Sequence, residues 1–175
     1  MRRPAALAAL GMLAGVISLA ACGGSDFDPV VPVFTAEISG AVTRSAAGVS
    51  AFGVIREGGQ TGFTFVMEDE TGTSIFLQKP SIAKPIPGEY EIVPADEVGP
   101  LNLYRGVVHV IVDGALEVYE AQSGVLVIAE ATPTSLKGTF ELTAVRTSPC
   151  CDPEPVTIQV AGTYTAIQGP VAALR

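Results

Sequence analysis

The amino-acid sequence predicts an all-β domain, folded either as an antiparallel β-sandwich or as a closed β-barrel of about nine strands. Three observations support this fold class. β-Branched and aromatic residues alternate with polar ones in many short segments, and glycine and proline separate those segments. No stretch after Pro32 keeps apolar residues at helical spacing for long enough to form an amphipathic helix. One core of this kind suits a chain of 175 residues.

The predicted strands share this alternation and are bounded by turn residues. In chain order they span residues 34–43, 49–56, 62–68, 73–78, 88–93, 104–112, 116–121, 124–131, 136–145 and 156–167.

The residues between the predicted strands support the assignment in the first half of the chain. In the first strand Phe34, Ala36, Ile38 and Val42 share one face, which we expect to be buried. A glycine-containing connection at 57–61 and a turn at 69–72 have the lengths of β-hairpin loops. Three prolines between residues 80 and 87 then exclude a central strand there.

The second half is justified in the same way. Residues 107–112 are apolar on both faces and predict the most buried strand, and Asp113-Gly114 is a hairpin turn. Residues 116–131 are predicted to form one long strand with a bulge at 122–124. A Gly-polar-aromatic-polar pattern begins at Gly88, Gly138 and Gly162, which we interpret as glycine at a bend with an aromatic ring packed nearby.

The amino-terminal residues predict a helical signal peptide ahead of this domain. Met1 to Arg3 is basic, and residues 4–21 are uncharged and mostly Ala, Leu, Gly, Val and Ile. The segment ends in Leu19-Ala20-Ala21-Cys22, and in these residues the chain resembles the bacterial lipoproteins, in which small residues before a cysteine form the lipobox. Two other interpretations are an uncleaved transmembrane anchor and an ordinary secreted protein that is cut elsewhere.

The resemblance implies that Cys22 is the lipidation site and that cleavage falls just before it. The acyl chains would then hold the protein on a membrane, which places it in the cell envelope. An Asp directly after the cysteine often retains such proteins at the inner membrane. Gly23 stands there in this chain, so the outer membrane is favoured if the organism is Gram-negative. The predicted domains are a signal peptide at 1–21, a lipidated cysteine with a flexible tether at 22–32, and one all-β domain at 33–175.

Charge excludes nucleic acid as a partner. The chain has 10 Lys and Arg against 18 Asp and Glu, and removal of Arg2 and Arg3 with the signal peptide leaves 8 against 18, a net charge of minus 10. Binding to phosphodiester backbones needs clustered cations. An acidic body is also repelled by anionic lipid, so we expect it to stand away from the bilayer.

No catalytic constellation is visible, and the sequence predicts no enzyme, cofactor or metal site. His109 is the one imidazole, and alternation places it beside Val107 and Ile111, which indicates a hydrogen-bonded structural histidine. A Gly-x-Ser-x-Gly motif is absent, and the ligand spacing of zinc sites is not met. The acidic run Glu68-Asp69-Glu70 lies at a turn without calcium-loop spacing, which favours solvated charges over a weak cation site.

Cys150-Cys151, inside a proline-rich loop, is the least generic feature of the sequence. Three interpretations stay open. The two cysteines form a vicinal disulfide, they are free or intermolecular thiols, or they belong to a soft-metal or redox site. With Cys22 lipidated, the parity of the remaining two cysteines fits the first.

The function that these observations favour is a non-catalytic binding or structural module. The strand pattern of the last third of the chain is similar to small all-β domains of bacterial lipoproteins whose role is unassigned. We expect an unknown protein partner to contact the loops at 79–87 and 147–155. The alternative is a barrel that carries a small apolar ligand, as calycin-type barrels do, and large interior side chains would argue against it.

Overall fold

The computed structural model describes residues 30–57, 60–147 and 155–171. Within these ranges the chain forms nine strands, which are β1 (Val33–Gly40), β2 (Arg44–Glu57), β3 (Gln60–Asp69), β4 (Ser74–Lys79), β5 (Gly88–Ile92), β6 (Arg105–Val112), β7 (Ala115–Ala131), β8 (Ser135–Arg146) and β9 (Thr157–Gln168). The described part of the chain holds no helix that is long and apolar enough to cross a membrane.

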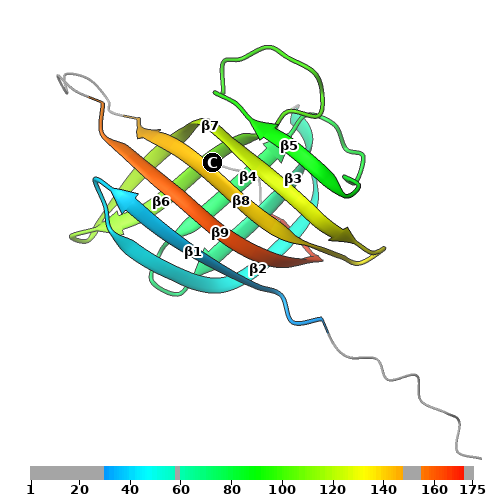
Figure 1. Ribbon diagram of the computed structural model, residues 1–175, viewed down its shortest axis with the longest axis horizontal. Coiled ribbons are helices and arrows are strands. Elements are labelled where there is room, and N and C mark those ends of the chain that lie inside the picture. Colours follow the sequence, from blue (N-terminus) through cyan, green and yellow to red (C-terminus); the bar gives the residue numbers. More distant parts are fainter. Residues whose placement is uncertain (1–29, 58–59, 148–154, 172–175) are drawn as a thin grey trace, which may run out of the picture.

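Eight of these strands close into an antiparallel β-barrel (Figure 1). Going around the barrel, the order is β7, β6, β4, β3, β2, β1, β9 and β8, and β8 pairs back with β7. The ninth strand, β5, is added because β7 is 17 residues long. The first half of β7 pairs with β6 and its second half pairs with β5, both on the edge that faces away from β8. Of the two architectures that the sequence left open, the barrel is the one formed.

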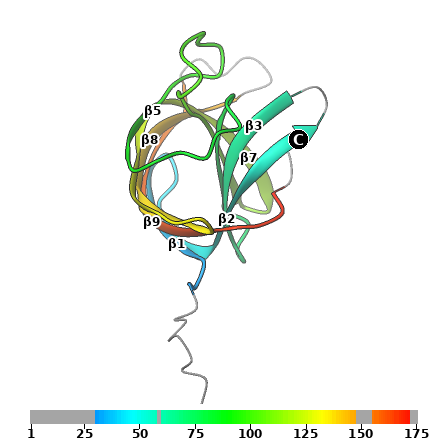
Figure 2. The same ribbon diagram turned by 90° about the vertical axis from the view of Figure 1, so that its right-hand side faces the viewer.

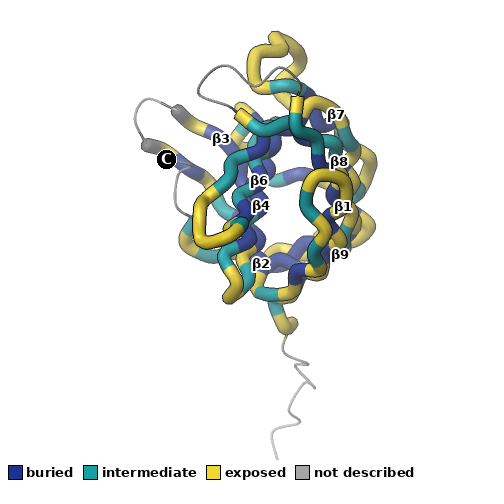
Figure 3. Tube along the Cα trace, turned by 90° about the vertical axis from the view of Figure 1, so that its left-hand side faces the viewer, coloured by how far each residue is buried: buried dark blue, intermediate teal, exposed yellow. Residues whose placement is uncertain are grey.

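The barrel has two ends with different connections. At one end, which we call the entry end, the described chain enters β1 at Val33, β4 finishes at Lys79 and β8 begins at Ser135. At the other, which we call the opposite end, lie the tight turns β1–β2, β3–β4 and β6–β7. Figure 2 faces the entry end and Figure 3 faces the opposite end.

Strand positions agree closely with the sequence prediction, including the bulge in β7, where the register shifts between Ala121 and Ser123. The first strand was predicted too long. It ends at Gly40, whose φ of 99° starts the turn, so Val42 and Thr43 lie outside it and β2 begins at Arg44.

The prediction that residues 107–112 form the most buried strand was wrong. Only the inward residues of β6 are buried, because a barrel has one interior and the outer residues of β6 are half-buried or exposed. Burial on both faces is found instead at the centre of β4, in Ile75, Phe76 and Leu77.

Aromatic side chains fill the interior. Tyr104, Tyr164 and Phe65 are all at most 2% exposed. The Phe65 ring centroid lies 5.3 Å from that of Tyr164, 6.1 Å from that of Tyr104 and 5.5 Å from that of Phe63. Eight strands enclose a space just wide enough for side chains, and each buried ring of this kind contributes about 1.5–3 kcal/mol. Packed rings therefore form the core of the barrel.

The repeated Gly-polar-aromatic pattern is explained by strand register. Gly138 of β8 lies opposite Tyr164 of β9, and Phe140 of β8 lies opposite Gly162 of β9. Each glycine thus makes room for the ring of the other strand. A Cβ at Gly162 would lie 2.7 Å from the Phe140 ring, and one at Gly138 would lie 3.0 Å from the Tyr164 hydroxyl. The Tyr164 hydroxyl donates to the Val127 carbonyl of β7 at 3.1 Å, across β8, which lies between β9 and β7. The interpretation of glycine beside a packed ring is confirmed for these two segments.

Candidate functional site

The opposite end of the barrel contains ionisable groups that satisfy one another. Arg146 of β8 and Glu117 of β7 form an ion pair of 3.0 Å, and the Tyr119 hydroxyl donates to the same carboxylate. Burial, together with the hydrogen bond and the charge of Glu117, raises the pKa of Tyr119 to about 12. Both partners of the ion pair are less than a third exposed. This network joins two neighbouring strands and needs nothing from outside the chain.

Arg44 closes the same end from the other side. Arg44 lies on the inward side of β2. Its guanidinium donates to the Thr73 hydroxyl at 3.3 Å and to the Ile111 carbonyl at 3.0 Å. These acceptors belong to the turn before β4 and to β6. The arginine therefore links β2 to β6 and to the turn before β4.

At the entry end one lysine lacks such partners among the described residues. Lys79, the last residue of β4, is 5% exposed, and burial lowers its pKa. Its ammonium lies 5.8 Å from the centroid of the Phe63 ring. Among the described residues it forms no hydrogen bond and no ion pair, and it lines the hollow described below. The lysine thus places a buried positive charge where the chain offers only an aromatic face.

A second lysine lies at the same end. Lys84 comes from the loop between β4 and β5, and its ammonium lies 4.7 Å from the centroid of Phe52 while it donates to the carbonyls of Thr132 and Pro133. The loop is also held by a hydrogen bond from the Phe63 amide to the Ser81 carbonyl, 3.1 Å long. The loop at 79–87, in which we expect partner contacts, is therefore held against the barrel at Ser81 and Lys84.

A hollow of about 410 Å³ opens beside Lys79. It is lined by Thr61, Gln78, Lys79, Pro80, Ala95 and Arg105. Arg105 is brought next to β4 by its cross-strand pairing with Gln78. Its guanidinium donates to the Glu97 carbonyl at 2.8 Å, and its Nε is buried without a partner in the described part of the chain. We call this feature the basic hollow.

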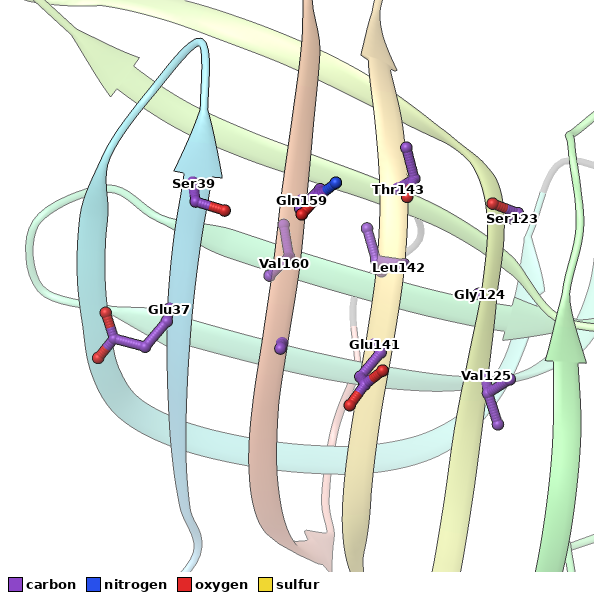
Figure 4. A pocket seen from close by; sticks show the side chains of 11 residues that line it. Glu37, Ser39, Ser123, Gly124, Val125, Glu141, Leu142, Thr143, Gln159 and Val160 are labelled. Carbon is purple, nitrogen blue, oxygen red and sulfur yellow. The ribbon is translucent and has the colours of Figure 1, made fainter.

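A second depression, of about 440 Å³, lies on the outer surface of β1, β9, β8 and β7 (Figure 4). Carboxylates from Glu37 and Glu141 project from β1 and β8, on either side of β9. Glu37 accepts a 2.7 Å hydrogen bond from Ser45. Hydroxyl and amide side chains make up most of the remaining polar lining, so this surface can hydrogen-bond to a polar partner.

The residues singled out in the sequence lie apart from both depressions. His109 shares the outer face of β6 with Val107 and Ile111, as alternation predicted, and packs edge-on against Phe76 with ring centroids 5.3 Å apart. Burial lowers the pKa of its imidazole. The contact that holds the ring is aromatic rather than the hydrogen bond we expected, because the outer face of β6 offers it Phe76.

Asp69 of the acidic run organises a turn. Burial alone would raise the pKa of its carboxyl, but hydrogen bonds from Thr71 and Thr73 outweigh burial and lower it. The backbone amides of these threonines donate at 2.9 and 2.7 Å. Among the described residues no group of three potential metal-ligating side chains is found.

Cys22, Cys150 and Cys151 lie outside the described residues, so their lipidation and pairing stay predictions. Sequence reasoning missed the basic hollow. The sequence did mark one of its residues. The alternation of Ile75, Leu77 and Lys79 places a lysine on the buried face of a strand. Nothing local marked Arg105, because its position depends on pairing with β4.

The described residues define a class of protein, a closed all-β barrel with a packed interior and depressions on its outside. In comparisons with known proteins, no family model matches the chain, and no curated protein or solved structure matches it. Function therefore has to be argued from the residues themselves.

Proposed function

We propose that this chain is a lipid-anchored, non-catalytic binding module of the cell envelope, which recognises its partner on the outside of the barrel. The packed interior is the observation that carries the proposal. Tyr104, Tyr164 and Phe65 occupy the space that a carrier would need for its ligand, with ring centroids at contact distance. Binding then falls to the outer depressions and the loops.

Anchoring comes from the lipobox ending at Cys22, and the outer membrane is the favoured location in a Gram-negative cell. The test is the intact mass of protein purified from the membranes of a bacterial host. We expect a chain that starts at Cys22 and carries acyl groups, and a Cys22→Ala variant that keeps residues 1–21. A wild-type protein of unmodified full-length mass would reject the anchor.

The mode of binding is tested by native mass spectrometry of the same preparation, sprayed from detergent. We expect the mass of the acylated chain alone. A further mass that disappears on denaturation would overturn external binding and support the alternative, a barrel that carries a small apolar ligand. A closed barrel is one requirement of such a carrier, and it is met; the filled interior supports the module instead.

A further inference from the structure

We infer that the basic hollow is a binding site for a phosphate group, with Lys79 and Arg105 supplying the positive charges. The inference deepens the proposed function, since it names the chemistry that one outer depression would recognise. Its own test does not depend on lipidation, because a chain without acyl groups would still present the hollow.

Lys79 is the first reason. A buried ammonium loses its hydration and is normally compensated by a carboxylate or by hydrogen-bond acceptors. Lys79 is 5% exposed, and within the described ranges its recorded contact is the face of Phe63. A cation–π contact of 5.8 Å replaces only part of that hydration. An anion from outside the chain would supply the rest.

Arg105 is an independent second reason. One of its terminal nitrogens is fixed by the Glu97 carbonyl, which holds the guanidinium in place. Its Nε is buried without an acceptor among the described residues. Buried donors without partners are rare and costly, so this N–H also points to an absent acceptor. A guanidinium that is held by one nitrogen and free at another is suited to an oxyanion.

The two cations line one hollow together with neutral donors. Gln78 is the cross-strand partner of Arg105, and Thr61 lies at the beginning of β3. An amide and a hydroxyl can both donate to oxygen. Among the described residues that line the hollow there is no carboxylate, in a chain with 18 Asp and Glu against 10 Lys and Arg. The described lining of the hollow thus combines two cations with two neutral donors.

Charge favours phosphate over carboxylate. Two formal positive charges line the hollow, and a phosphate monoester carries about −1.5 to −2 at pH 7, whereas a carboxylate carries one negative charge. The hollow has a volume of about 410 Å³, which leaves room for the group to which the phosphate is attached. That group can be soluble, or it can be the glycerol of a lipid whose headgroup is a phosphate monoester, since both present the same three oxygens.

Calorimetric titration of the purified protein in an uncharged detergent, with inorganic phosphate at constant ionic strength and pH 7, tests the site. We expect saturable binding of one phosphate per chain. Lys79→Met and Gln78→Glu should each weaken it at least tenfold, the first by removing a cation and the second by placing a carboxylate beside Arg105. Lys137→Met is the matched control, because Lys137 is exposed and already paired with Glu130 at 3.5 Å.

A repeat in vesicles that contain phosphatidic acid, whose headgroup is a phosphate monoester, separates a lipid from a soluble phosphate. Loss of phosphate binding there assigns the hollow to a headgroup, and unchanged affinity assigns it to a soluble phosphate. The inference is overturned if the wild-type protein shows no saturable binding in detergent. It is overturned equally if acetate binds as tightly as phosphate, or if Gln78→Glu folds normally and binds phosphate as the wild type does.

Discussion

The two ends of the barrel differ in the partners of their buried and partly buried cations. At the opposite end, Arg146 has Glu117, and Arg44 has a hydroxyl and a carbonyl. At the entry end, Lys79 faces a phenylalanine ring, and the Nε of Arg105 has no acceptor in the described part of the chain. A cation with a built-in partner stabilises the fold, whereas one without a partner costs stability and is available to a ligand. The comparison therefore separates a structural end from a binding end.

Removal of the carboxylate that pairs with Arg146 should change the stability of the protein most. Glu117→Gln removes the carboxylate from Arg146 and Tyr119, and leaves two partly buried groups without their partner. We expect a loss of about 1–3 kcal/mol in the free energy of unfolding. Urea denaturation measures it. A change smaller than the error of that measurement would mean that the opposite end is not held by this network.

Alkaline pH should weaken the same end. The folded state keeps the Tyr119 phenol neutral, with a pKa of about 12, whereas the phenol ionises near pH 10 in the unfolded chain. Its contribution is thus fully present below pH 10 and is lost as pH rises towards 12. Burial also raises the pKa of Tyr104 and Tyr164, which adds to the loss.

Denaturation midpoints of the wild type and Tyr119→Phe between pH 9 and pH 12 measure the contribution of this group. Tyr119→Phe should lose less stability over that range than the wild type. Parallel curves for the two proteins would exclude a contribution from Tyr119.

At the entry end we expect removal of a cation to stabilise the protein. Lys79→Met replaces a desolvated ammonium by an apolar side chain of similar length, against the Phe63 ring. We expect the free energy of unfolding to rise by about 1 kcal/mol, which corresponds to about 2–4 °C in the melting temperature. Scanning calorimetry in phosphate-free buffer shows this. Destabilisation would mean that Lys79 is held by contacts that its cation–π geometry does not account for.

The smallest effect on the barrel should come from reduction of Cys150-Cys151, a pair that lies outside the described residues. For a vicinal disulfide we expect no thiol labelling before reduction and a mass lower by about 2 Da than that of the reduced chain. A melting temperature nearly unchanged on reduction would fit, because the closed loop is minimal. Labelling without reductant would exclude the disulfide.

Most of the strands could be predicted from sequence because their signals are local. Alternation placed Phe34, Ala36 and Ile38 on one buried face, and Asp113-Gly114 marked a tight hairpin. Closure of the sheet was not predictable in this way. It depends on the pairing of β7 with β8 along nearly the whole of β7, and a sandwich would have the same alternation.

The candidate site could be predicted only in part. Lys79 follows the inward alternation of β4, so its burial was visible in principle, although an end-of-strand lysine usually reaches solvent. Arg105 could not be found, since its place beside Gln78 comes from pairing between β4 and β6, which the chain separates by 25 residues or more. His109 drew attention by its chemistry and proved to be a ring packed on Phe76.

Thermal unfolding with and without millimolar phosphate, at constant ionic strength, tests the contrast between the two ends most directly. A ligand that binds only the folded state raises the melting temperature. We predict that phosphate raises it for the wild type and for Glu117→Gln, which starts from a lower value, but not for Lys79→Met, which starts from a higher one. A phosphate-dependent rise that persists in Lys79→Met, or a lower starting temperature for that variant, would contradict the account.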